Sequence, residues 1–210
     1  MKIMFKKALI YAAGIALLAG CAALTTKKVD HGDALALMKA SFKSRGQADI
    51  SRIDQDELQR VCSDYAERGE ELPKALREKL EATELSKVKY PADGKYLGNW
   101  REGERIAQNG RGFQWSDQAS AGAGGNCYAC HQIAKAELSY GNIGTTLNEY
   151  GKLRGASEPI LKYTWAKIYN AHSFNACSSM PRFGEKKILT ETQIQDLMAL
   201  LLDPDSPVNK

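Results

Sequence analysis

The sequence predicts an all-α protein, and three observations favour this fold class. Apolar residues recur at helical spacing through residues 33–89, with polar breaks between the segments. A further helical pattern over about residues 100–109 precedes a Cys-x-x-Cys-His motif at residues 127–131. Near the C-terminus, a capped helix is predicted over residues 191–202. We therefore expect helices joined by loops throughout.

The first twenty residues predict an export signal. Three lysines lead into an apolar stretch over residues 8–19, which is too short to span a bilayer and suits the core of a signal peptide. The run Leu18-Ala19-Gly20-Cys21 then resembles the bacterial lipobox, in which a peptidase cuts before the cysteine and the thiol receives a lipid. We expect cleavage after residue 20 and lipid attachment at Cys21; ordinary cleavage near Ala23 is the alternative.

The charge balance gives no indication of a nucleic-acid partner. The chain has 29 basic and 25 acidic residues, a formal net charge of +4. Loss of Lys2, Lys6 and Lys7 with the signal leaves 26 basic residues against the same 25 acidic ones. No second long apolar run follows, so the sequence predicts no transmembrane helix.

Residues 21–94 are predicted to form a helical extension. One helix carries an apolar stripe, the next is capped by Ser51 or Asp54, and the third has Pro73 in its first turn. We expect the stripes to face a core. Their apolar members are, helix by helix, Leu35, Leu37, Met38 and Phe42; Leu58, Val61 and Cys62; and Leu76, Leu80 and Leu85. The turn-like residues 90–94 mark the boundary with a domain over residues 95–210.

This second domain is predicted to contain at least three helices. The first stops at Gly110-Arg111-Gly112, and the others cover residues 158–170 and 191–202. Thr190 begins the last helix and Asp203-Pro204 ends it. A glycine-rich run over residues 121–125 is not followed by Gly-Lys-Ser or Gly-Lys-Thr, so it is no phosphate loop.

The run Cys127-Tyr128-Ala129-Cys130-His131 is the signature of covalent haem c attachment. Cys127 and Cys130 are expected to bond the two vinyl groups on one haem edge, while His131 binds the iron. The glycines just before the motif are expected to let the backbone approach that edge. Zinc or a redox-active dithiol is the alternative, but structural zinc wants four ligands, and no second Cys-x-x-Cys follows.

One haem c with helices before and after it gives the outline of a class I-type monohaem cytochrome c domain. Haem of this kind is attached outside the cytoplasmic membrane, which agrees with the export signal and indicates the periplasm. The mature protein is then expected in the periplasm, tethered to the membrane through the lipid at Cys21.

The second axial ligand is predicted to be Met180. It lies in Ser178-Ser179-Met180-Pro181-Arg182-Phe183-Gly184, a loop before the last helix, where small c-type cytochromes carry a methionine ligand. His172 and Cys177 are the competitors, and either would lower the reduction potential relative to thioether sulfur. Met38 lies in the extension, and Met198 sits among leucines, where packing explains it.

Two further cysteines, Cys62 and Cys177, have no assigned role. In an oxidising compartment leftover cysteines often pair, so a disulfide is predicted, with two buried free thiols as the alternative. Such a bond would tie the extension to the loop of Met180. Arg182 is expected either to pair with a haem propionate or to lie solvated at the surface.

From about Gly98 to the end, the chain resembles the SoxX family, the small monohaem subunits of the SoxAX complex in bacterial thiosulfate oxidation. The matching runs are spread over this region, which makes up a little over half of the chain. They are residues 103–112, 126–131, 150–155, 162–165, 168–170, 180–184 and 200–204.

The resemblance implies partners and a reaction. The larger SoxA cytochrome would form a heterodimer with this chain and join thiosulfate oxidatively to a cysteine thiol on the carrier SoxYZ, an L-cysteine S-thiosulfotransferase activity. This chain would accept the electrons and pass them to an acceptor cytochrome c, with no catalytic residue of its own. The alternative functions are a stand-alone, membrane-tethered electron carrier for another respiratory enzyme, and a haem sensor or peroxidase with a labile distal ligand.

One departure from the family concerns the orientation of the ligand histidine. Relatives carry Gly-Pro-Ser-Leu after the haem motif, and the proline carbonyl accepts the histidine N–H, whereas here the run is Gly144-Thr145-Thr146-Leu147. A backbone carbonyl survives this change, so Thr145 is expected to orient His131 in a less rigid loop.

Overall fold

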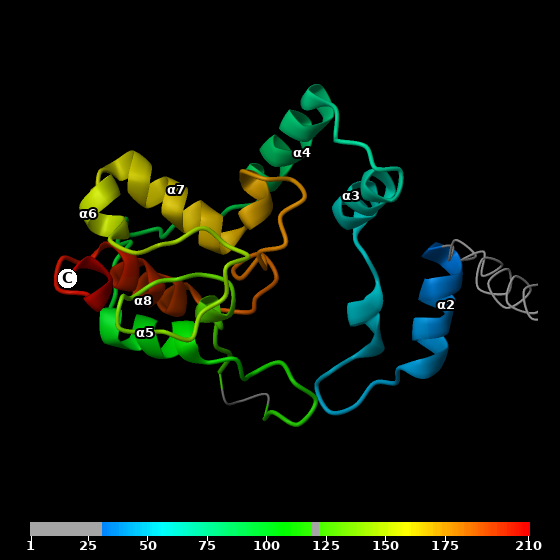
Figure 1. Cartoon of the computed structure of the whole chain (residues 1–210), viewed down its shortest axis with the longest axis horizontal. Coiled ribbons are helices and arrows are strands. Elements are labelled where there is room, and N and C mark those ends of the chain that lie inside the picture. Colours follow the sequence, from blue (N-terminus) through cyan, green and yellow to red (C-terminus); the bar gives the residue numbers. More distant parts are fainter. Residues whose placement is uncertain (1–30, 119–121) are drawn as a thin grey trace, which may run out of the picture. The chain divides into compact units, whose positions relative to one another are not determined.

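The computed structural model describes residues 31–118 and 122–210 (Figure 1). The predicted signal peptide and Cys21 lie outside the described residues. The chain divides into two units, residues 1–43 and residues 44–210. No helix within the described residues has both the length and the apolar character needed to cross a membrane.

The described part of the first unit is one helix, α2, over His31–Ser41. Its apolar stripe was expected to face a core, and this expectation is wrong for three of its members. Leu37, Met38 and Phe42 are exposed, with 69%, 41% and 60% of their surface accessible.

The second unit is built from helices and short 3-10 turns. Its α-helices are α3 (Glu57–Glu67), α4 (Lys74–Ser86), α5 (Trp100–Gln108), α6 (Tyr150–Arg154), α7 (Glu158–Tyr169) and α8 (Glu191–Leu202). The 3-10 turns are η1 (Ile50–Ile53), η3 (Cys127–Ala129), η4 (Ala171–Ser173) and η5 (Pro207–Asn209). Residues 31–118 and 122–210 contain no strand beyond an isolated bridge between Arg45 and Ala48, so the all-α class is confirmed.

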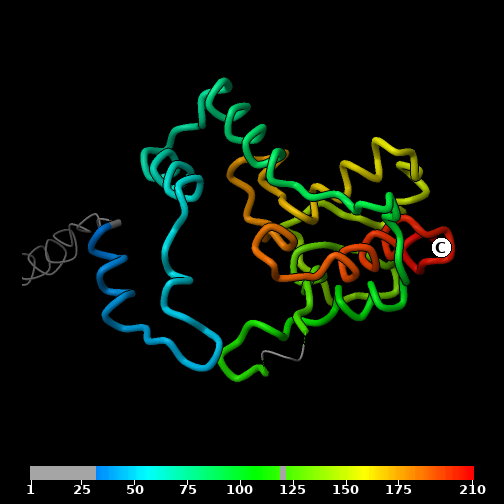
Figure 2. Tube along the Cα trace, turned by 180° about the vertical axis from the view of Figure 1, so that it is seen from behind, coloured from blue at the N-terminus to red at the C-terminus, as the bar shows by residue number. Residues whose placement is uncertain are grey.

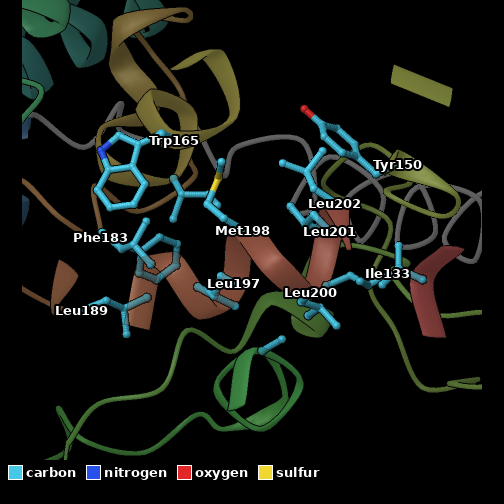
Figure 3. Packing of buried hydrophobic residues seen from close by; sticks show 14 of the residues in the cluster. Ile133, Tyr150, Trp165, Phe183, Leu189, Leu197, Met198, Leu200, Leu201 and Leu202 are labelled. Carbon is cyan, nitrogen blue, oxygen red and sulfur yellow. The ribbon is translucent and has the colours of Figure 1, made fainter. Parts of the chain in front are cut away.

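Helix α8 lies at the centre of the core (Figure 3). Its predicted bounds are confirmed, because Thr190 and Gln193 close a capping box at its start. Met198 is fully buried in it, in agreement with a packing role. Helix α5 packs closely against α8 through Gly103, where a Cβ would come within 2.1 Å of the Asp196 carbonyl oxygen.

The segment after α4 runs back over the domain to the start of α5 (Figure 2). Trp165 of α7 is fully buried and donates its indole hydrogen to the carbonyl of Lys89 over 2.8 Å. Gln195 of α8 donates to the carbonyl of Lys95 over 2.8 Å. Residues 44–94 therefore belong to the same unit as residues 95–210.

The start of α3 differs from the sequence prediction. Neither Ser51 nor Asp54 caps this helix; Asp56 does, and it forms a capping box with Gln59. Asp56 accepts the Gln59 backbone N–H, while the Gln59 side chain accepts the N–H of Asp56, each over 3.0 Å.

Candidate functional site

The Cys-x-x-Cys-His run forms a tight turn that begins with a left-handed residue. Asn126 has φ 48°, and η3 then covers Cys127–Ala129. The Tyr128 hydroxyl donates to Glu104 of α5 over 2.9 Å, which fastens the turn to the helix in front of it.

The glycines before the motif let the turn lie against the end of α5. A Cβ on Gly124 would come within 2.0 Å of the Asn109 carbonyl oxygen, and the Gly125 N–H donates to Ile106 over 2.8 Å. The close approach found here is therefore to the backbone of α5.

Cys127 and Cys130 are both free thiols. Burial raises the pKa of the Cys127 thiol to about 12, so the group is protonated at neutral pH. Redox-active cysteines and zinc ligands act as thiolates and carry lowered pKa values, so this environment does not favour a redox-active dithiol. Two neighbouring free thiols are what covalent haem attachment requires.

His131 is held by the loop that follows it. Its Nδ1 lies 2.7 Å from the carbonyl oxygen of Thr145, which confirms the contact expected from the sequence. A carbonyl can only accept, so Nδ1 carries the hydrogen and Nε2 keeps its lone pair, the form that binds a metal. The ring lies against Gly144, where a Cβ would come within 2.2 Å of Cε1.

His131 and Met180 lie on the wall of one cavity of about 260 Å³. Its other walls come from the loop after the motif and from α6, α7 and α8, and they include Leu147, Tyr150, Tyr163, Ile168 and Leu201. Met180 is half-buried and packs against the core. The structure thus brings the two predicted axial ligands to the same cavity, whose lining does not include Cys127 or Cys130. The four side chains together are of the types that haem c requires: two thiols, one imidazole and one thioether.

The two competing ligands are placed differently. Cys177 forms a disulfide with Cys62, with their Cα atoms 5.5 Å apart, so it offers no thiolate. His172 is buried, and its Nε2 donates to the carbonyl of Ser178 over 3.0 Å. It lines a second, more open cavity of about 700 Å³ that Met180 also borders and that does not include His131.

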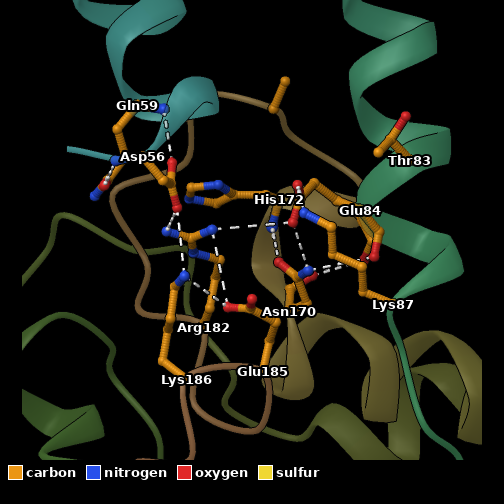
Figure 4. A network of polar contacts seen from close by, with 12 residues as sticks. Asp56, Gln59, Thr83, Glu84, Lys87, Asn170, His172, Arg182, Glu185 and Lys186 are labelled. Carbon is orange, nitrogen blue, oxygen red and sulfur yellow. Dashed lines mark hydrogen bonds and ion pairs between the residues drawn. The ribbon is translucent and has the colours of Figure 1, made fainter.

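Arg182 is neither at the surface nor free, which corrects the expectation of a solvated arginine. It is only 6% exposed and lies among carboxylates (Figure 4). Its Nη2 is 2.6 Å from Asp56, and its Nη1 is 3.8 Å from Glu185 and 4.0 Å from Glu84. Asp56 and Glu84 were not predicted from the sequence, although the spacing of Asp56 and Gln59 is that of a capping box.

In residues 31–118 and 122–210, no three His, Cys, Asp or Glu side chains gather to hold a metal ion. The predicted iron ligands, one imidazole and one methionine sulfur, include only one side chain of these types, so they do not form such a cluster.

No protein-family model matches the chain. It is 38% identical over 160 residues to a protein of Aquifex aeolicus (strain VF5) named "Uncharacterized lipoprotein", a match that covers 74% of this chain and 73% of that protein.

Proposed function

The chain belongs to the same family as the Aquifex aeolicus lipoprotein, and from this premise we propose that it is a membrane-tethered, monohaem c-type cytochrome that transfers electrons. One observation carries the proposal. His131, whose Nδ1 donates to the Thr145 carbonyl, shares a cavity with Met180 and directly follows two cysteines that form no disulfide.

Each residue of the site has a separate task in this proposal. Cys127 and Cys130 would hold the haem covalently, and His131 and Met180 would bind its iron. Haem c supplies a one-electron couple between ferric and ferrous iron when bound. The Thr145 carbonyl fixes the tautomer of His131 and raises its basicity, since it accepts the Nδ1 hydrogen. The apolar walls, with Leu147, Ile168 and Leu201, exclude water from the site.

A full ligand shell favours electron transfer over binding of small molecules at the iron. We therefore assign the chain an electron-accepting role with no catalytic residue of its own. The haem sensor or peroxidase function needs a labile distal ligand, and it becomes the better hypothesis if the reduced protein binds carbon monoxide readily.

The finer proposal is that the chain is the electron-accepting subunit of a SoxAX complex. It rests on the SoxX-like runs that flank the haem motif, residues 103–112, 150–155 and 180–184 among them. In this role the chain binds a SoxA-like cytochrome, accepts the electrons released when thiosulfate is coupled to SoxYZ, and delivers them to an acceptor cytochrome c.

The proposed location is the periplasm, with a lipid at Cys21 as the tether. The lipobox-like run supports it, and so does the name of the Aquifex protein, which calls that relative a lipoprotein.

Mass spectrometry of the mature protein tests the cofactor and the tether together. We expect the added mass of one haem on the peptide with Cys127 and Cys130, and that of a lipid on Cys21. A mature chain without haem would reject the proposed function, whereas a chain with haem and an unmodified Cys21 would reject only the lipid tether.

Co-purification from thiosulfate-grown cells tests the partner. Recovery in a stable complex with a second haem protein supports the SoxAX assignment. Recovery as a free monomer, from cells that make a functional SoxA, rejects it and favours the stand-alone electron carrier.

A further inference from the structure

Residues 56–84 are bound to the loop that carries Met180 by contacts of three kinds. This loop, residues 175–186, is here called the methionine loop. An ion-pair cluster, a disulfide and a side-chain to backbone hydrogen bond connect it to α3 and α4. None of these contacts touches the Cys-x-x-Cys-His turn, so the function proposed above does not account for them.

The ion-pair cluster centres on Arg182, two residues after Met180. A guanidinium that is 94% buried needs partners, because an unpaired buried charge is strongly destabilising. Asp56 is the closest, with Oδ2 2.6 Å from Nη2, and Lys186 of the same loop lies 3.4 Å from that oxygen. Asp56 is thus held between two cations of the methionine loop.

Asp56 is also the N-cap of α3, and this second task fixes its position. One carboxylate oxygen, Oδ1, accepts the Gln59 N–H, which leaves Oδ2 for Arg182. The start of α3 and the methionine loop are therefore joined through one side chain.

Glu84 fixes the other side of Arg182. It is 3% exposed, and Oε2 accepts the Asn170 amide hydrogen over 2.8 Å, while Lys87 pairs with Oε1. Arg182 approaches Oε2 at 4.0 Å. Because Asn170 ends α7, this carboxylate connects α4, α7 and the methionine loop.

The covalent contact lies on the other side of Met180. Cys62 of α3 is bonded to Cys177, three residues before Met180. Next to it, the Ala176 N–H donates to Glu81 of α4 over 3.3 Å. The methionine loop is thus tied to α3 and α4 both before and after Met180.

We propose that α3 and α4 are a brace that positions Met180 as the sixth iron ligand, with Asp56 and Glu84 as positioning residues and the disulfide Cys62–Cys177 as the second attachment. This inference rests on the proposed function, because it presupposes a haem iron for Met180 to bind. It gives the extension a role in ligation rather than in folding alone.

The experiment compares four variants with the wild type in the full-length, haem-loaded protein. Asp56→Asn removes the charge but keeps a capping residue at the start of α3. Asp56→Glu tests rescue by a restored carboxylate. Asp49→Asn is the matched control, because Asp49 caps η1 through Ser51 and makes no contact with the methionine loop. Cys62→Ser/Cys177→Ser removes the covalent attachment.

Imidazole competes with Met180 for the ferric iron, and the sulfur-to-iron charge-transfer band reports how much methionine is still bound. For Asp56→Asn we expect the imidazole concentration at half-displacement to fall roughly tenfold, the loss typical of a charge-assisted hydrogen bond. Asp56→Glu should recover most of this loss, and Asp49→Asn should have the same half-displacement concentration as the wild type. In the double serine variant the half-displacement concentration should fall at least tenfold. Equal concentrations for the wild type, Asp56→Asn and the double serine variant would overturn the inference.

Hydrogen exchange of the Ala176 and Ser178 amides separates this inference from the proposed function. If the wild type shows no sulfur-to-iron band, Met180 ligation fails, and with it the ligand set of the proposed function. The brace itself is then supported by faster exchange of these amides in Asp56→Asn than in Asp49→Asn, and it is rejected by equal exchange.

Discussion

His131 donates its Nδ1 hydrogen to the Thr145 carbonyl over 2.7 Å, so the backbone of Thr145 orients the imidazole ring. The chemistry of the acceptor settles the tautomer, because a carbonyl oxygen has no hydrogen to give. The same loop presses Gly144 against the ring face. Two backbone features, the carbonyl of residue 145 and the bare Cα of residue 144, therefore orient the ring.

Gly144→Ala should displace the His131 ring. The new Cβ would come within 2.2 Å of Cε1, closer than non-bonded carbon atoms approach, so either the ring or the loop must move. We expect a loss of about 1–3 kcal/mol in unfolding free energy, as for other overpacked sites, measured by urea denaturation. The haem absorption spectrum should change as well.

Gly110→Ala is the control for this substitution. Its Cβ would meet only the side-chain amide of Asn126 at 3.3 Å, which can shift by a few tenths of an ångström. If Gly144→Ala has the stability and spectrum of Gly110→Ala, His131 is not held as described.

Met180→Ala should open the iron on one side. The sulfur-to-iron band should disappear completely, and the reduced protein should bind carbon monoxide, which the wild type should resist. Met38→Ala is the matched control, since Met38 is 41% exposed on α2. Retention of the band in Met180→Ala would identify another sulfur ligand and reject Met180. If the band is lost but carbon monoxide still does not bind, another side chain has taken the position, with His172 as the first candidate because its Nδ1 is buried with no hydrogen-bond partner among the described residues.

Arg182→Gln should lower the unfolding free energy by about 1.5–3 kcal/mol, because Asp56 and Glu84 lose a charge-assisted contact but keep Lys186 and Lys87 as partners. Denaturant titration measures this loss. Arg105→Gln serves as the comparison: Arg105 pairs with Glu102 at the surface, where its side chain is 73% exposed, and such pairs contribute about 0–1 kcal/mol. Equal losses of unfolding free energy in the two variants would show that the ion pairs of Arg182 stabilise the fold no more than a surface pair does.

The Asp56 contacts predict a defined loss of stability in acid. Burial tends to raise the pKa of this carboxyl, but the Gln59 N–H, Arg182 and Lys186 outweigh burial and hold its pKa at about 2 rather than 3.8. A carboxyl with a depressed folded-state pKa stabilises the fold above its ordinary pKa and loses that contribution as the pH falls through the folded value.

The measurement is the difference in unfolding free energy between the wild type and Asp56→Asn. Glu84, Glu185 and His172 also lie near Arg182, and because both proteins contain them, their contributions largely cancel in this difference. We expect a constant difference above about pH 5 and a decrease below about pH 4 that continues as the pH falls through 2. A difference that grows on acidification contradicts the assigned direction.

The helices were predicted better than the contacts between them, because the signals for a helix lie close together in the sequence. Helix α8 has the predicted bounds because Thr190 and Gln193 are close in sequence and close its capping box. The start of α3 was assigned to Ser51 or Asp54 because capping residue types are frequent there, and only the Gln59 spacing selects Asp56.

In the candidate site, too, the local motif was predictable from the sequence and the long-range contacts were not. The spacing of Cys127, Cys130 and His131 is local and could be read directly. Arg182 and Asp56 lie 126 residues apart, and no sequence pattern around either residue predicts that they pair. Their pairing depends on how α3 packs against the methionine loop, which is a property of the tertiary structure.

Reduction of the Cys62–Cys177 disulfide should destabilise the protein without releasing the haem. The bond spans 115 residues, and a cross-link over so long a segment restricts the unfolded chain strongly, so we expect a loss of about 2–4 kcal/mol in unfolding free energy. The proposed haem should stay attached, because the thioether bonds proposed for Cys127 and Cys130 would not be thiol–disulfide couples. Denaturant titration with and without a thiol reductant measures the loss, and Cys62→Ser/Cys177→Ser should match the reduced wild type. A reductant effect that persists in the double serine variant would place its origin elsewhere in the chain.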